Sequence, residues 1–79
     1  MMVEADVRTT CEAVSKAGHD LNNVCASILG FTTLAQDLAE PASILAQYLA
    51  EIELAAHHAI EVAQRLHDLS AKLRTNVSA

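Results

Sequence analysis

The stretch Gly18-His19-Asp20-Leu21-Asn22-Asn23 brings an imidazole, a carboxylate and two amides together within two turns of a segment rich in helix-forming residues. A neutral imidazole has a free ring nitrogen and is suited to nucleophilic attack on phosphorus. In a helix, His19 would lie about 200° around the axis from Ala17 and from Leu21, which belong to the apolar stripe. We therefore expect the ring outside the core, within reach of solvent and of a partner protein.

Two neighbours of His19 are suited to assist it. Asp20 follows it directly, and a carboxylate there would orient the ring and stabilise its charged form. Asn23 comes four residues after His19 and so lies on the same side of the helix, where its amide would position a water or a phosphoryl oxygen. From spacing alone, the competing interpretation is a solvated surface histidine beside an acid.

One strong break divides the chain, at Ala39-Glu40-Pro41-Ala42. Proline has no amide donor and suits the first turn of a new helix, and Ser43 is suited to local capping. We expect a single domain, residues 1–79, with one helix over about 3–38, a hinge at 39–42 and a second helix over about 43–75. Gly18 inside the first helix would leave the backbone there locally soft or permit the close approach of a neighbour.

Apolar and small residues recur every seven positions in both helices. In the first helix the central row is Val7, Val14, Leu21, Ile28 and Ala35, flanked on one side by Cys11, Gly18, Cys25 and Thr32 and on the other by Ala17, Val24, Phe31 and Leu38. In the second helix the central row is Leu45, Ile52, Ala59, Leu66 and Leu73, flanked by Leu49, Ala56, Ala63 and Ser70 and by Tyr48, Ala55, Val62 and Leu69. Such stripes are wider than a two-stranded coiled coil needs. Folding at residue 40 pairs the central rows, Ile28 with Ile52 for example. The pattern predicts an all-α protein: an antiparallel helical hairpin that homodimerises into a four-helix bundle.

Composition narrows the possible functions. The 79 residues carry a formal net charge of −5 and 3% aromatic residues, which disfavours nucleic-acid binding. The apolar runs are too short for a membrane segment, and the first residues lack a basic signal-peptide region, so we expect a cytoplasmic protein. Cys11 and Cys25 are about 21 Å apart along one helix, too far for an intrachain disulfide. We expect buried free thiols there, a disulfide across the dimer being the alternative.

The stretch from Gly18 to Asn23, followed by Ile28-Leu29-Gly30-Phe31 and Leu34-Ala35, resembles the H-box of sensor histidine kinases in its H-D-F-N-N variant. The second helix is similar to the family's second helix in Tyr48-Leu49-Ala50-Glu51-Ile52, in Ala63-Gln64-Arg65-Leu66 and in Leu69-Ser70. The resemblance covers roughly residues 10–74. It implies the dimerisation and histidine-phosphotransfer (DHp, HisKA-type) domain, a homodimeric four-helix bundle.

The resemblance also assigns roles. His19 would be the phosphoacceptor that attacks the γ-phosphate of ATP, and Asp20 the acidic residue that orients and activates it. Asn23 would assist dephosphorylation of the partner. The phosphoryl group would pass to an aspartate on the receiver domain of a response regulator, which brings its own Mg²⁺. Ala26, Ser27 and Gly30, with the facing second helix, would contact that receiver.

The chain departs from the family pattern at Leu21, where phenylalanine is commoner, and at Val24, where many members have proline. No glycine-rich nucleotide lid and no N-box follow residue 74, so we expect no cofactor bound by this chain, with ATP and Mg²⁺ supplied by a separate catalytic domain. The chain is then either a fragment of a larger kinase or a phosphotransfer protein charged by a kinase in trans. A purely structural helical dimerisation module is the remaining alternative.

The other histidines offer weaker signals. His57 has Glu53 and Glu61 four residues before and after it, a spacing that can place metal ligands on one face. No further ligand is evident and no paired Glu-x-x-His motif is present, so we expect no metal site. His67 is expected to face solvent.

Overall fold

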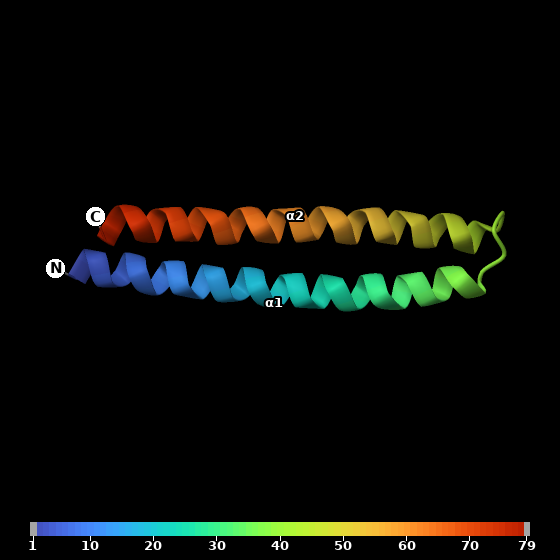
Figure 1. Ribbon diagram of the computed structural model, residues 1–79, viewed down its shortest axis with the longest axis horizontal. Helices are drawn as coiled ribbons and strands as arrows, with labels where there is room; N and C mark the ends of the chain where they lie inside the picture. Colours follow the sequence, from blue (N-terminus) through green and yellow to red (C-terminus); the bar gives the residue numbers. More distant parts are fainter. Residues whose placement is uncertain (1, 79) are drawn as a thin grey trace.

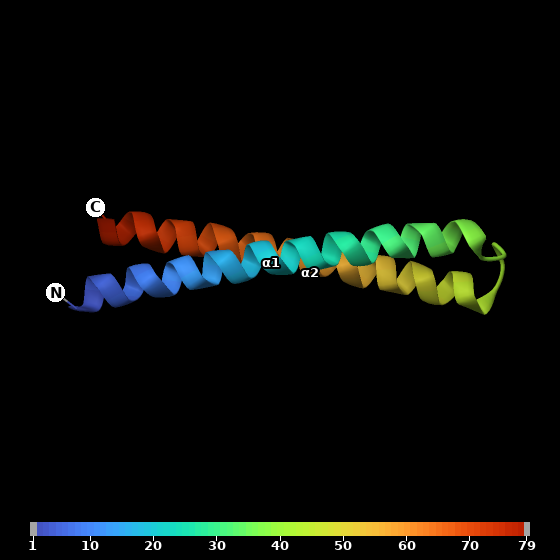
Figure 2. The ribbon, with the colours of Figure 1, turned by 90° about the horizontal axis from the view of Figure 1, so that it is seen from below.

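The computed structural model describes residues 2–78, and these form two long helices joined by a short connection (Figure 1). Helix α1 spans Met2–Leu38 and helix α2 spans Ile44–Ser78. The helices run antiparallel, with the start of α1 and the end of α2 at the same end, and they cross near their middles (Figure 2). The Cα positions extend over 60 × 14 × 13 Å along the principal axes. The predicted all-α helical hairpin is confirmed.

The connection between the helices corrects the expected place of Pro41. The Ser43 N–H donates to the Glu40 carbonyl at 3.0 Å, so Glu40 to Ser43 form a turn with Pro41 at its second position, where a fixed φ near −65° is favoured. Pro41 therefore lies before α2 and not in its first turn. Ser43 is the cap: its Oγ accepts from the Ala46 N–H at 3.0 Å, and α2 begins one residue later. At its other end, α2 continues three residues beyond the expected 75.

The buried residues of the hairpin recur every seven positions in each helix. All but Leu49 are small, and we call them the small-residue rows: Cys11, Gly18, Cys25 and Thr32 on α1, and Leu49, Ala56, Ala63 and Ser70 on α2. Gly18 stands against Ala63, and the antiparallel arrangement extends this register along both rows. The two buried hydroxyls are satisfied within their own helices, since Thr32 donates to the Ile28 carbonyl at 2.7 Å and Ser70 to the His67 carbonyl at 2.9 Å. Cys11 and Cys25 are buried free thiols, as expected.

These rows are not the ones that the sequence pairs at the centre of the hairpin. Leu21 and Ile28 remain 39% and 41% exposed, and Ile52 remains 44% exposed. Small side chains let two helices approach closely, whereas rows of leucine and isoleucine would hold the axes apart. The flanking small-residue rows therefore take the contact between α1 and α2, and the large side chains lie beside it.

Those large side chains form an exposed apolar face along one side of the hairpin. In both helices they occupy two heptad rows: the row three residues after the small-residue row, and the next row, three residues further on. At 100° per residue, both rows of both helices face the same side of an antiparallel pair. The apolar face comprises Leu21, Val24, Ile28 and Phe31 of α1 and Leu45, Tyr48, Ile52, Leu66, Leu69 and Leu73 of α2, all of them exposed. The small core of the single hairpin thus leaves most of its large apolar side chains uncovered.

The two glycines of α1 differ in their surroundings, which gives a matched test of the close contact. A Cβ on Gly18 would meet the Ala63 carbonyl oxygen at 3.1 Å, whereas a Cβ on Gly30 would meet nothing within 4 Å. Gly30→Ala should raise the free energy of unfolding by about 0.5–1 kcal/mol, because alanine is the better helix former. Gly18→Ala should gain less or lose stability, because the facing backbone must move away. Chemical denaturation of both variants measures the difference; an equal gain at both sites would contradict the close approach at Gly18.

Candidate functional site

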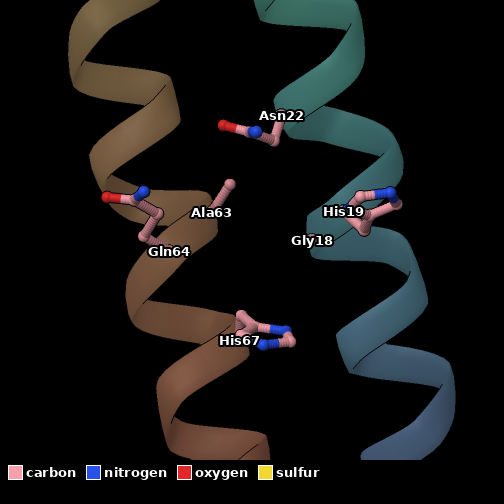
Figure 3. A pocket seen from close by; sticks show the side chains of 6 residues that line it. All are labelled: Gly18, His19, Asn22, Ala63, Gln64 and His67. Atoms are coloured by element: carbon pink, nitrogen blue, oxygen red, sulfur yellow. The ribbon is translucent and has the colours of Figure 1, made fainter.

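His19 is exposed and lines a pocket of about 180 Å³ between the two helices. Figure 3 shows the pocket and the side chains around it. Its lining residues are Gly18, His19 and Asn22 of α1, and Ala63, Gln64 and His67 of α2. His19 is thus exposed and lies outside the buried rows, as predicted.

The close contact between Gly18 and Ala63 forms the base of this pocket. The approach is permitted by the missing side chain of Gly18, as the 3.1 Å distance from a hypothetical Cβ to the Ala63 carbonyl shows. Since Gly18 immediately precedes His19, the same contact that joins the helices also fixes the backbone beside the imidazole. The nucleophile candidate therefore stands on a helix held at that point by its neighbour.

The pocket and the apolar face lie on opposite sides of the small-residue rows. Leu21 comes three residues after Gly18 and turns to one side, while Asn22 comes four residues after it and turns to the other. On α2, Leu66 and His67 are divided in the same way about Ala63. Association through the apolar face would therefore leave His19 uncovered.

A second imidazole enters the pocket from α2. The Oγ of Ser15 lies 2.9 Å from Nδ1 of His67, a hydrogen bond that connects the two helices. The His67 ring extends from α2 toward α1, and the Asn22 side chain extends from α1 toward α2 (Figure 3). His67 is exposed, as the sequence predicts, and its ring is in addition hydrogen-bonded to α1.

The other two residues predicted around His19 lie outside this pocket. Asp20 and Asn23 are both exposed, and neither is among the lining residues. The α1 amide that lines the pocket belongs to Asn22. Asn22 is rotated by about 300° around the helix axis from His19 and therefore lies on the side of α2. The roles expected for Asp20 and Asn23 stay predictions.

Two of the three predicted partner contacts, Ser27 and Gly30, border a second hollow, of about 270 Å³, on α1. Ala26, Ser27 and Gly30 are all exposed. Ser27 and Gly30 line the hollow together with Phe31 and Leu34, which are 73% and 61% exposed. Ser27 lies eight residues, or about 12 Å along the axis, beyond His19 toward the turn. An exposed aromatic ring and an exposed leucine beside a glycine are suited to contact another protein.

Neither α1 nor α2, over the part of each that is described, combines the length and apolarity needed to cross a membrane. Within residues 2–78, no group of three or more histidine, cysteine, aspartate or glutamate side chains is arranged to hold a metal ion. His57 and His58 are both exposed on α2.

Asn22, Gln64 and His67 are the polar pocket residues that sequence reasoning missed. The signal that finds them is the register of the two helices: once Gly18 is set against Ala63, residues one and four positions after each lie on the same side of the contact. The central-row pairing used for the sequence prediction could not reveal this, because it set the wrong rows face to face.

Comparison of the chain with protein-family models, with curated proteins and with solved structures found no match. The helical hairpin and the pocket around His19 are therefore the observations on which a function must be argued.

Proposed function

We propose that this chain is the dimerisation and histidine-phosphotransfer unit of a two-component histidine kinase, with His19 as its phosphoacceptor. The observation that carries the proposal is an exposed histidine on a long helix, beside a close helix contact and an open pocket. Phosphoryl transfer depends mainly on positioning and charge stabilisation, which a nucleophile on a rigid helix suits. The H-box resemblance of residues 18–23 supports the same function.

In the proposed reaction, the lone pair of one His19 ring nitrogen attacks the γ-phosphorus of ATP. The N–P bond forms as the bond to the bridging oxygen of ADP breaks, and ADP leaves with the electron pair. The other ring nitrogen then gives up its proton, for which the adjacent Asp20 carboxylate is the proposed acceptor. A separate ATP-binding domain, in the same polypeptide or in trans, supplies ATP and Mg²⁺ in the cytoplasm.

The second transfer would go from His19 to an aspartate on a receiver domain that holds its own Mg²⁺. We assign receiver contact to Ala26, Ser27 and Gly30, which lie on the same helix as His19 and are all exposed. Asn23 would serve the reverse reaction by positioning a water against the phosphorylated receiver.

Homodimerisation is part of the proposal, and the exposed area supports it. A compact protein of 8.4 kDa exposes about 4,600 Å², whereas this hairpin exposes 5923 Å². Its radius of gyration is 17.7 Å, against about 12 Å for a compact domain of this length. The excess is of the order that one partner buries in a stable interface, and it includes the apolar face. Two hairpins joined by this face would form a four-helix bundle.

The test is incubation of the chain with ATP, Mg²⁺ and a panel of histidine-kinase ATP-binding domains from the same genome. We expect acid-labile, base-stable phosphate on the chain, as phosphohistidine requires, and its onward transfer to a receiver domain. A structural dimerisation module is the second candidate, since the apolar face alone supports association. A stable dimer that takes phosphate from no kinase domain, and from no phosphorylated receiver in the reverse reaction, would favour that candidate.

A further inference from the structure

Among the α2 side chains that the structure describes, His67 alone both lines the pocket beside His19 and hydrogen-bonds to α1. Its partner Ser15 precedes His19 by four residues, one turn along the same side of α1. The hydrogen bond therefore holds the second imidazole directly next to the turn that carries the first. Nothing in the phosphoacceptor role of His19 by itself calls for this arrangement.

The side chains around the pocket are suited to an anion. Two imidazoles and two amides line it, and none of its six lining residues is an acid. When the Ser15 hydroxyl donates to Nδ1 of His67, the remaining ring proton is on Nε2, which is then a free donor. One water needs roughly 15 Å³ of such space, so a pocket of about 180 Å³ has room for a phosphoryl group.

We infer that His67, held by Ser15, donates a hydrogen bond from Nε2 to the phosphoryl group carried by His19, and that the pocket between α1 and α2 is the binding site of that group. The inference rests on the proposed function of His19 as phosphoacceptor. A donor to a phosphoryl dianion makes a charge-assisted hydrogen bond that exists only in the phosphorylated state. It therefore stabilises phosphohistidine at residue 19 relative to the other histidines of the chain.

The experiment uses phosphoramidate, a small phosphodonor that needs no kinase domain. A ring nitrogen of the protein attacks its phosphorus, the P–N bond of phosphoramidate breaks, and ammonia leaves and takes up the proton that the ring releases. The four histidines of one chain then compete for the same donor, with the exposed His57 as an internal reference. NMR of phosphorus and of the imidazole protons measures the occupancy of each site while the donor is in excess.

In the unmodified sequence, we expect the ratio of phosphate on His19 to phosphate on His57 to be higher than in a chain without the His67 donor. We also expect the His67 resonances to shift when His19 is phosphorylated. His67→Leu should lower that ratio roughly three- to tenfold, the range for one charge-assisted hydrogen bond in an open site. Leucine is a good helix former, and thermal unfolding checks that the hairpin remains.

Two further variants separate binding of the phosphoryl group from a merely structural role. His67→Gln keeps a donor near the position of Nε2 and should restore most of the ratio, whereas His67→Asn keeps a partner for Ser15 near Nδ1 and should not. Rescue by asparagine alone, or an unchanged ratio in His67→Leu, would overturn the inference.

The outcome is separate from that of the kinase assay. Phosphate taken from ATP with no effect of His67→Leu leaves the proposed function standing. Failure to take phosphate from any kinase domain or receiver overturns that function itself.

Discussion

Replacing His19 by glutamine should reduce the incorporation of phosphate from ATP by at least about a thousandfold, to the level of the background. Glutamine keeps a polar side chain of similar reach but has no lone pair that can attack phosphorus, so the bond-forming step is lost. His19 is exposed, and its replacement removes no buried contact. The helical content and the unfolding temperature should therefore stay close to those of the original chain. Autoradiography after base and acid treatment, with circular dichroism on the same samples, measures both.

His57→Gln is the matched control for that experiment. His57 is also an exposed histidine on a long helix, but it does not line the pocket. We expect it to retain full phosphate incorporation. Full incorporation in His19→Gln, or loss of incorporation in His57→Gln instead, would show that His19 is not the nucleophile of the chain.

The helices and their connection could be predicted from the sequence because their determinants are local. Seven-residue periodicity, strong helix formers and a single proline give two helices and one turn, and α1 ends at Leu38 as expected. The place of Pro41 was missed because a proline suits both the first turn of a helix and the second position of a β-turn. The turn hydrogen bond from Ser43 to Glu40 and the capping contact of Ser43 decide between them.

The contact between the helices could not be predicted in the same way. Three adjoining rows on each helix are apolar or small, so the pattern indicates the width of the stripe but not which row faces which neighbour. Size complementarity decides it: Gly18 and Ala63 allow a close approach that Leu21 and Ala59 were expected to make. His19 was found from its residue type and exposure, but Gln64 and His67 depend on this register. The pocket therefore became visible only with the packed pair.

The second large prediction concerns Ile52→Glu, a substitution in the apolar face. Ile52 is 44% exposed in the single hairpin, so a glutamate there keeps access to water and costs the hairpin little. In a four-helix bundle joined by the apolar face, the same carboxylate would be buried without a partner, at a cost of several kcal/mol. A symmetric dimer contains the substitution twice.

Leu54→Glu is the matched control, because it makes the same chemical change on the same helix. Leu54 is 64% exposed and belongs to the row of Gln47, Glu61 and Asp68, which lies away from the apolar face. We expect Ile52→Glu to raise the dissociation constant of the dimer at least about a hundredfold and Leu54→Glu to leave it within a few-fold. Sedimentation equilibrium should give twice 8.4 kDa for the original chain and for Leu54→Glu, and a single chain for Ile52→Glu at the same concentration. Equal effects of the two substitutions would mean that the hairpins associate through another surface.

Because His19 lies on the side of the hairpin opposite the apolar face, a monomeric Ile52→Glu hairpin should still accept phosphate from phosphoramidate. This result would separate the role of the dimer from the chemistry of the histidine.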